Sequence, residues 1–591
     1  MKRAETENKY KWRLEDIYAS DADWEIDFDC IKRKYKQIED FKGQLGKADK
    51  LLECLRLQDG LSADITKLYV YAMMRKDEDG RVDKYVGMTD RIAALANDFS
   101  AASSFVGSEI SALDEAHLSA VINRPDFADF DYTLKEISRK KKYILSDKEE
   151  RLLAMSGKAL GGYQDAFMIL ENVDLPLPTL KINGEKAKLT HGKYSYYLSN
   201  GEPKTRKAVF EGMYGAIKKV VNTTAVLYSN SVKADNFYSE ARGHDSSMEA
   251  ALYQNDVPMK VYDNLVRSVR KGQKAMHEYV ALRKKTLGLP VMHVYDMYVP
   301  IVKSVNMSVP YEDAYQLVLE GLKPMGQEYR NLLLQAKNEG WIDVCENEGK
   351  RSGAYSCSCY KAHPFVLLNY SRTTHDIFTI AHEMGHALHS YYSNLAQPHS
   401  KHNYQIFVAE VASTVNEVLL IKHLLKTAKD RETRMFLLNY YLDMFRTTMF
   451  RQTMFAEFEM LTHDMESKGY PLTVASLSDK YYALNKKYYG NALRHDSDIK
   501  YEWARIPHFY SAFYVYQYAT GITSAINIVK KILTDESFYQ TYKDKFLSAG
   551  GSDSPYLILK NTGVDLAATE PFEVAMNEFD EVLHELKREL E

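Results

Sequence analysis

The feature that most constrains this chain is a pair of histidines four residues apart, in the run HEMGH at residues 382–386. Residues with that spacing share one face of an α-helix, so a helix here aims both imidazole rings at one point. Upstream, Thr373 and Asp376 occupy the positions of a helix cap and of the third residue after it. We therefore predict a helix that begins near residue 373 and presents two nitrogen ligands on one face.

The glutamate inside this run gives the pattern a chemical meaning. His382 and His386 can hold one zinc ion, and Glu383 then points beside the metal, where it can take the proton from a zinc-bound water. The alternative is an ordinary surface helix with two histidines. Gly385 is a poor helix residue, which indicates either the close approach of another backbone or local packing.

A catalytic zinc keeps three protein ligands and one open position, so a third ligand has to be found. The metzincin spacing fails, because it requires a glycine and a histidine where the chain has His389 and Tyr392. The thermolysin-like and aminopeptidase-like spacings fail too, because Gln405 and Ile406 occupy the zone where those enzymes have a glutamate. His389 lies on the same helix face as His386 and could compete, although one straight helix rarely surrounds a tetrahedral ion.

Two acids in the next segment are the remaining candidates. The run FVAEVASTVNE at residues 407–417 predicts a helix from which Glu410 and Glu417, seven residues apart, project on nearly the same face. A carboxylate among apolar residues needs a partner, because burying a bare charge is costly, and a zinc ion supplies that partner. On spacing alone either acid could be the ligand, while the other could hold a ligand imidazole. The alternative is two solvated acids on a mixed face.

The rest of the chain is mostly helical in pattern. Its 591 residues exceed the size at which a single core stops growing, so we expect at least two lobes. We place an N-terminal helical lobe at 1–200 and the larger part that carries the chemistry at 201–591. A hairpin is predicted around Asn183-Gly184, and a short strand at 364–370. Helices are predicted at 204–243, 261–287 and 571–590.

Composition excludes several classes of partner. The 77 basic and 81 acidic residues leave a formal charge of −4, which gives no electrostatic case for nucleic acid. No apolar run approaches the length that spans a bilayer, and the N-terminus lacks the apolar segment of a signal peptide. We therefore expect a cytoplasmic protein without a nucleic-acid or membrane partner. The five cysteines are too sparse for a disulfide framework and fit a reducing compartment: Cys30, Cys54, Cys345, Cys357 and Cys359.

Several motifs together resemble the thimet-oligopeptidase-type zinc peptidases, in particular their oligoendopeptidase F group. The resemblance rests on HEMGH, on AEVASTVNE, and on the blocks at 12–18, 353–370, 505–521 and 547–566. It implies a mostly α fold in which two helical lobes enclose a deep channel, with a small β-sheet beside the zinc-binding helices. It also implies one Zn²⁺ per chain, Glu410 as the third metal ligand, and cleavage of short unstructured oligopeptides.

The segment RIPHFYSAFYVYQY at 505–518 holds the candidates for the substrate side. Tyr510, Tyr514 and Tyr518 have helical spacing, and His508 precedes them. Peptide hydrolysis generates an oxyanion that needs hydrogen-bond donors, and we assign His508 and Tyr514 to that role, with Tyr510 next as a substrate contact. A tyrosine stripe is otherwise typical of core or interface packing. The strand at 364–370 could be an edge that pairs with an extended peptide, or an ordinary buried strand.

These residues together predict a zinc metalloendopeptidase that hydrolyses internal bonds of short peptides, with Glu383 as general base. One alternative is a zinc carboxypeptidase or dipeptidase on a similar helical scaffold, in which Arg494 or Arg505 binds a substrate terminus. Another is a non-catalytic peptide-binding protein, which the intact Glu383 disfavours. The sequence gives no oligomeric state.

Overall fold

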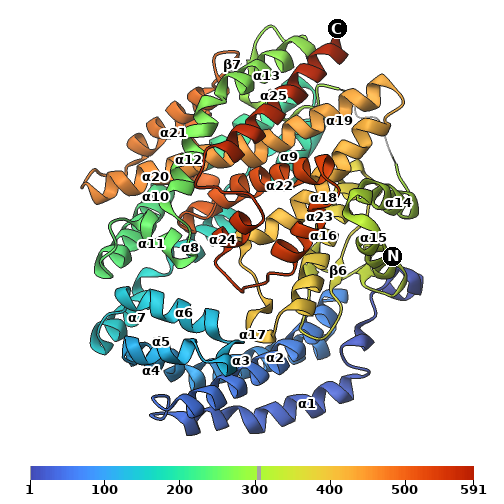
Figure 1. The fold of residues 1–591 in the computed structure, drawn as a ribbon. Helices are drawn as coiled ribbons and strands as arrows, with labels where there is room; N and C mark the ends of the chain where they lie inside the picture. Colours follow the sequence, from blue (N-terminus) through green and yellow to red (C-terminus); the bar gives the residue numbers. More distant parts are fainter. Residues whose placement is uncertain (1, 303–307) are drawn as a thin grey trace. The chain divides into compact units, whose positions relative to one another are not determined.

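The computed structural model describes residues 2–302 and 308–591, and helices dominate it, as predicted (Figure 1). The chain divides into two compact units, each assembled from three segments. The first contains Met1–Lys142, Asn306–His423 and Ile528–Gly563, and the second contains Tyr143–Val305, Leu424–Asn527 and Val564–Glu591. The predicted boundary near residue 200 falls inside the second unit. The division into 1–200 and 201–591 therefore does not coincide with these units, and it stays a prediction about domains.

The first unit is built around two long helices, α16 (Thr374–Ala396) and α18 (Ile406–Thr427), of which α18 ends just inside the second unit. Their buried faces are rich in valine, leucine, isoleucine and alanine, which gives both helices apolar contacts along most of their length. The other helices of this unit are α1 (Asp21–Lys34), α2 (Ala48–Glu78), α3 (Asp83–Ser103), α4 (Phe105–Ala112), α5 (Glu115–Ile122), α6 (Asp131–Lys140), α14 (Tyr311–Gly321), α15 (Gly326–Asn338), α17 (His399–His402), α23 (Phe538–Tyr542) and α24 (Pro555–Asn561).

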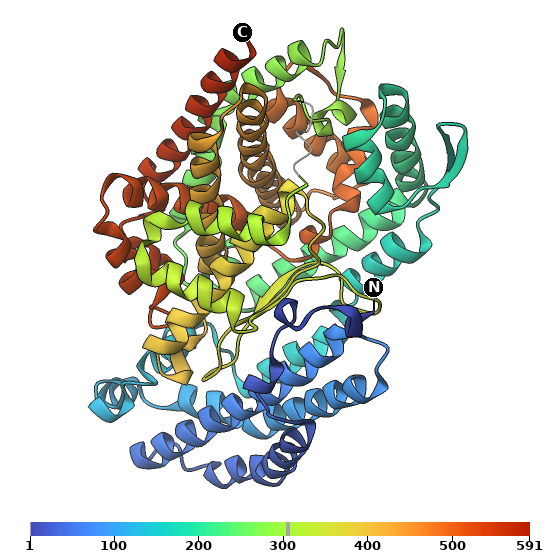
Figure 2. The ribbon, with the colours of Figure 1, turned by 90° about the vertical axis from the view of Figure 1, so that its right-hand side faces the viewer.

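A three-stranded sheet packs against α16 in the same unit (Figure 2). Strand β6 (Phe365–Leu367) lies in its centre, parallel to β4 (Ile342–Asp343) and antiparallel to β5 (Tyr355–Cys357). The strand predicted at 364–370 is thus confirmed as β6, and of the two alternatives left open by the sequence, an edge strand or a buried strand, the structure has the buried strand. Its three residues are buried and pair with β5, while Val366 and Leu367 also pair with β4. The sheet edge on the antiparallel side is β5.

The second unit is also helical, and its longest helix is α10 (Pro203–Ala241), which confirms the helix predicted at 204–243. The hairpin of β1 (Thr179–Ile182) and β2 (Glu185–Lys188) turns at Asn183 and Gly184, whose φ angles are 51° and 89°, as a two-residue hairpin turn requires. The remaining α-helices and strands are α7 (Asp147–Leu160), α8 (Tyr163–Ile169), α9 (His191–Asn200), α11 (Ser247–Gln254), α12 (Met259–Lys271), α13 (Gln273–Thr286), α19 (Arg431–Met444), α20 (Arg451–Ser467), α21 (Val474–Tyr489), α22 (Tyr516–Thr534), α25 (Glu570–Leu590), β3 (Met292–His293) and β7 (Leu493–Arg494). From Ile528 on, α22 belongs to the first unit.

The single helix predicted at 261–287 is divided in two at Gly272, which separates α12 from α13. A Cβ atom at this position would lie 2.3 Å from the sulfur of Met576 in α25. The glycine therefore lets α25 pack directly against the junction, and this long-range contact leaves no trace in the local pattern. The C-terminal helix predicted at 571–590 is confirmed as α25.

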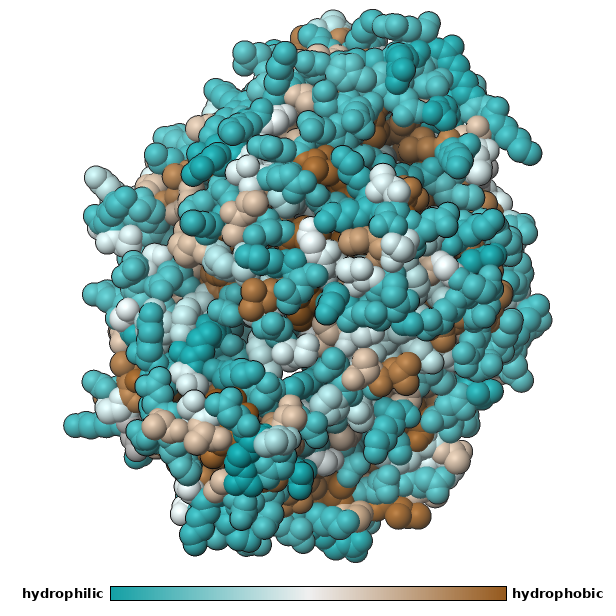
Figure 3. Space-filling view, in the orientation of Figure 1, coloured by the Kyte–Doolittle hydropathy of each residue, from teal (hydrophilic) through white to brown (hydrophobic). Residues whose placement is uncertain are grey.

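The surface is mostly hydrophilic on the face drawn in Figure 3, where apolar side chains form small separate groups. Among the described residues, no helix combines the length and the apolar content needed to cross a membrane. All five cysteines are free thiols.

Candidate metal centre

The helix that carries the HEMGH run begins where the sequence predicts. Thr373 caps α16, because its hydroxyl oxygen accepts a hydrogen bond from the backbone N–H of Asp376 at 3.2 Å. The Asp376 carboxylate in return accepts the backbone N–H of Thr373 at 2.8 Å, which completes a capping box. The predicted start of the helix is therefore confirmed.

Three side chains from α16 and α18 converge on one point. The Nε2 atoms of His382 and His386 lie 3.2 Å apart, and a carboxylate oxygen of Glu410 lies 3.7 Å from His382 Nε2. One potential ligand atom from each of these residues falls within 4.8 Å of the other two. Two nitrogens bound tetrahedrally to one zinc ion, each at 2.0–2.1 Å, would be separated by roughly 3.3 Å. The donor atoms present thus fit a single metal ion of this size.

Residues of α18 hold both imidazole rings. His382 Nδ1 lies 2.6 Å from a carboxylate oxygen of Glu417, and His386 is hydrogen-bonded to the backbone of Ala409. These contacts fix both rings so that their Nε2 atoms face each other. Of the two acids that spacing left open, Glu410 is therefore the one beside the Nε2 atoms, and Glu417 is the one that orients an imidazole.

The protonation of the two rings reflects this arrangement. Burial opposes a charge on His382, but the hydrogen bond and the charge of Glu417, with Glu383 and Glu410, raise the pKa of His382 to about 9. Burial and the neighbouring His382 lower the pKa of His386 to about 3. His382 is therefore the protonated ring and His386 the neutral one near neutral pH, and a metal ion held by both rings would displace a proton from His382.

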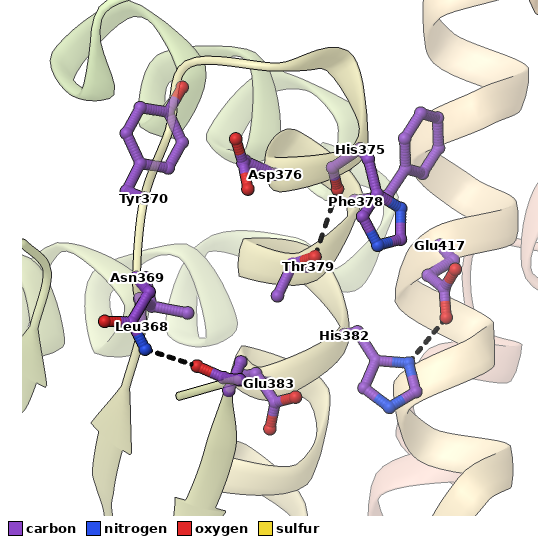
Figure 4. Close-up of a pocket in the computed structure, with 12 residues that line it drawn as sticks. Leu368, Asn369, Tyr370, His375, Asp376, Phe378, Thr379, His382, Glu383 and Glu417 are labelled. Atoms are coloured by element: carbon purple, nitrogen blue, oxygen red, sulfur yellow. Dashed lines mark hydrogen bonds and ion pairs between the residues drawn. The ribbon is translucent and has the colours of Figure 1, made fainter. Parts of the chain in front are cut away.

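Glu383 lies outside the ligand group, at the bottom of a pocket of about 610 Å³ (Figure 4). The residue is only 8% exposed, and burial raises the pKa of its carboxyl group to about 7, with Glu410 and Glu417 adding to the rise. His382 and a hydrogen bond from the backbone of Ser356, in the edge strand β5, act in the opposite direction. A bound cation nearby would also lower this pKa.

Gly385 lies where α16 and α18 cross. A Cβ atom on this residue would meet the Cα of Ser413 at 2.6 Å and the carbonyl oxygen of Ala412 at 2.8 Å. Of the two explanations that the sequence left open, close approach of another backbone is confirmed. Glycine here lets α18 come near enough for Glu410 and Glu417 to reach the histidines of α16.

His389 does not join the ligand group. It is 1% exposed, stacks on Tyr404 with ring centroids 3.6 Å apart, and contacts Phe546 on its other side. Its burial among these rings lowers the pKa of His389 to about 3. It is therefore a neutral packing residue, as expected from the geometry of one straight helix.

The segment at 505–518 lies in the second unit and is not one helix. The 3₁₀ helix η12 (Pro507–Tyr510) ends before Tyr514, and α22 begins only at Tyr516. The helical stripe predicted for the tyrosines is therefore wrong, because Phe513 between them has a φ of 54° and breaks the hydrogen-bond ladder.

His508, Tyr514 and Tyr518 nevertheless form a cluster. The His508 ring lies 6.1 Å from the Tyr514 ring and 6.0 Å from the Tyr518 ring, and the Tyr518 hydroxyl is 3.5 Å from His508 Nε2. Partial burial lowers the pKa of His508, so a neutral imidazole rather than an imidazolium is its form near neutral pH. Tyr510 turns away, stacks on Phe167 at 4.5 Å and buries its hydroxyl.

Sequence reasoning did not identify the upper wall of the pocket. His375 and Thr379 lie on the same helix face as His382, at intervals of four and three residues, and line the pocket with Tyr370. The helical periodicity of α16 was the signal that would have found them. The buried Asn416, which directly precedes Glu417, has no distinctive spacing and was not predicted.

The comparisons with known proteins agree with this centre. The sequence profile described as peptidase family M3 matches residues 196–578, and the profile described as Oligopeptidase F matches residues 109–176. The protein named Oligopeptidase PepF from Bacillus subtilis is 41% identical over 589 residues, which cover 99% of this chain and 88% of the relative.

Two crystal structures are close to this fold. A Chlamydophila abortus chain assigned to the peptidases is 33% identical with a TM-score of 0.94, covering 100% of this chain and 99% of its own. The oligoendopeptidase-F of Enterococcus faecium is 34% identical with a TM-score of 0.75, covering 96% of this chain and 99% of its own. The chain therefore belongs to peptidase family M3, in its oligoendopeptidase F group, and is a metallopeptidase with a candidate metal centre at His382, His386 and Glu410.

Proposed function

We propose that this protein is a zinc endopeptidase that cleaves internal bonds of short unstructured oligopeptides, with one Zn²⁺ held by His382, His386 and Glu410. The observation that carries the proposal is the convergence of these three side chains, with Glu383 beside them at the bottom of a pocket. Two imidazoles and one carboxylate form a donor set typical of catalytic zinc sites, which leave one coordination position open.

The catalytic roles follow from the chemistry of amide hydrolysis. When bound, the metal supplies Lewis acidity that polarises the scissile carbonyl and lowers the pKa of water. Glu383 accepts the proton of the attacking water at its carboxylate and then delivers it to the leaving amine nitrogen. Glu417 holds the His382 ring in place through its contact with Nδ1.

We assign His508 and Tyr514 as hydrogen-bond donors to the oxyanion, and Tyr510 as a substrate contact. Support comes from the clustering of His508 with Tyr514, which brings two donors together on one short segment. The buried hydroxyl of Tyr510 favours a role for its ring rather than for its O–H group. The channel between two lobes and the cytoplasmic location stay predictions from the sequence.

The lining of the pocket favours internal cleavage over removal of C-terminal residues. None of the described residues that line it is a lysine or an arginine, whereas a carboxypeptidase needs a cation for the free carboxylate of its substrate. The relatives named oligopeptidase and oligoendopeptidase point to the same substrate class. The edge strand β5, rather than the buried β6, is the strand that an extended peptide could pair with.

A mass-spectrometric time course on matched substrates tests this function. The set contains one folded protein, short fragments of the same sequence, and those fragments blocked at both termini, with E383Q protein as the control for contaminating peptidases. We expect the blocked fragments to be cut internally and the folded protein to survive, because cleavage of a buried amide requires unfolding first. Release of terminal residues alone, with blocked fragments intact, would establish the exopeptidase instead.

A further inference from the structure

A buried asparagine links the two helices of the metal centre. Asn416 is fully buried, and its side-chain amide donates a hydrogen bond to the backbone carbonyl oxygen of Ala381 at 3.0 Å. Ala381 directly precedes His382 on α16, and Asn416 directly precedes Glu417 on α18. This bond therefore joins the backbones of the two helices at the positions next to the His382–Glu417 contact.

The position of this bond matters because it adds a link between the two backbones one turn away from their close approach at Gly385. At Gly385 the backbone of α16 lies so near α18 that a Cβ atom there would be 2.6 Å from the Cα of Ser413. A single point of contact leaves α18 free to rotate about it, whereas a second link one turn away along each helix fixes the rotation. Glu410 and Glu417 lie on either side of this pair of links, so both carboxylates depend on the angle that the links set.

A third helix fixes the orientation of the amide. The Tyr329 hydroxyl of α15 donates to the side-chain oxygen of Asn416 at 3.0 Å, and Tyr329 is 1% exposed. A backbone carbonyl only accepts hydrogen bonds, so the nitrogen of Asn416 has to face Ala381 and its oxygen has to face Tyr329. The amide of Asn416 therefore has a partner at both ends, because its nitrogen donates to Ala381 and its oxygen accepts from Tyr329.

We propose that Asn416, oriented by Tyr329, is a positioning residue of the metal centre, which holds α18 at the angle where Glu417 orients His382 and Glu410 meets the metal. The proposal rests on the proposed metal site but concerns residues that contact neither metal nor substrate. The Asn416 side chain sets the positions of Glu410 and Glu417, and its loss weakens metal binding more than it lowers the stability of the fold.

The test measures metal affinity rather than turnover. Full-length wild-type, N416L and Y329F proteins are loaded with zinc, and the dissociation constant is determined by competition with a chelator at fixed pH. We expect N416L to weaken zinc binding by roughly 10–100-fold, the range typical for residues that support a metal ligand. Y329F removes one hydrogen bond and should weaken it by roughly two- to tenfold. In the Co²⁺-substituted proteins, the visible spectrum should change in N416L.

N527L is the matched control. Asn527 of α22 is also buried, and its amide donates to the backbone carbonyl of Pro571 at 2.8 Å, at the start of α25. N527L should lower the melting temperature about as much as N416L and leave zinc affinity unchanged.

Wild-type zinc affinity and an unaltered cobalt spectrum in folded N416L would overturn the proposal. If N416L does not fold, Y329F decides in the same way. A wild-type protein that binds no metal would instead overturn the proposed function.

Discussion

The crossing of α16 and α18 and the segment at 507–518 both carry residues assigned to catalysis, yet they are built in opposite ways. For α16, the capping box and the spacing of the histidines predict a helix, Gly385 lets another backbone come close to it, and the structure contains all three features. In the segment, tyrosines spaced by four suggest a helix that does not form. Spacing predicts a helix only where the intervening backbone can continue its hydrogen bonds.

The conformation of the segment at 507–518 depends on a contact with another helix rather than on its own sequence pattern. Phe513 has a left-handed backbone conformation, and its N–H donates to a carboxylate oxygen of Glu459 at 3.0 Å. Glu459 is fully buried, and this burial raises its pKa well above the usual range. A buried acid from α20 therefore supports the turn that places His508, Tyr514 and Tyr518 together, so the geometry of this region depends on another helix.

The largest expected effect is a loss of kcat without a loss of zinc, in a variant of Glu383 at the crossing of α16 and α18. E383Q keeps the shape of the side chain and removes the base, so we expect kcat to fall by roughly 10²–10⁴-fold. Zinc content should remain at the wild-type level, because Glu383 lies outside the ligand group. Steady-state kinetics with metal analysis of the same sample checks both, and loss of zinc in E383Q would make Glu383 a ligand.

In the segment at 507–518, H508A and Y514F should lower kcat without lowering zinc affinity. Removal of one donor to a developing oxyanion typically costs roughly 10²–10³-fold in kcat. Y510F is the internal control, since the Tyr510 hydroxyl is buried and the ring contact with Phe167 survives the change. Equal losses in Y510F and Y514F would assign the effect to packing of the segment.

The two acids of α18 should separate by metal affinity. E410A removes a proposed ligand and should abolish tight zinc binding. E417A leaves three ligands but frees the His382 ring, so we expect zinc to bind roughly 10–100-fold more weakly than in the wild type. Chelator competition measures both variants, and a weaker effect for E410A than for E417A would exchange the two roles.

The smallest effect tests the close approach of the two helices. G385A places a methyl group 2.6 Å from the Ser413 Cα, which should cost about 1–3 kcal/mol of stability and loosen zinc binding. G215A, on α10, meets no atom within 4 Å and should instead stabilise the protein by about 0.5–1 kcal/mol, as alanine favours a helix. Chemical denaturation measures the change in the free energy of unfolding for both variants. A change of the same sign in both would refute the close approach of the two helices at Gly385.

Local patterns predicted much of this structure because local forces build it. The capped helix at 374–396, the hairpin at Asn183-Gly184 and the helix α10 depend on residues near one another in sequence. The choice between Glu410 and Glu417 could not come from spacing, since residues seven apart share a face and only the crossing at Gly385 decides which nitrogen each acid reaches.

The features that the sequence left open or did not predict share one cause, which is dependence on distant segments. β6 became a central strand because β4, only two residues long, pairs with its other side. Gly272, at the break between α12 and α13, lies against Met576, and the N–H of Phe513 in the turn donates to Glu459. No short window of sequence contains both partners of these contacts, so each was invisible to spacing and propensity.

Anomalous X-ray scattering at the zinc edge, from crystals of the zinc-loaded protein, tests the central claim most directly. We predict one peak per chain, at 2.0–2.2 Å from His382 Nε2, His386 Nε2 and a Glu410 carboxylate oxygen. Glu383 and Glu417 should lie outside the coordination sphere. A peak coordinated by Glu417 in place of Glu410, or active protein with no peak at these residues, would contradict the account.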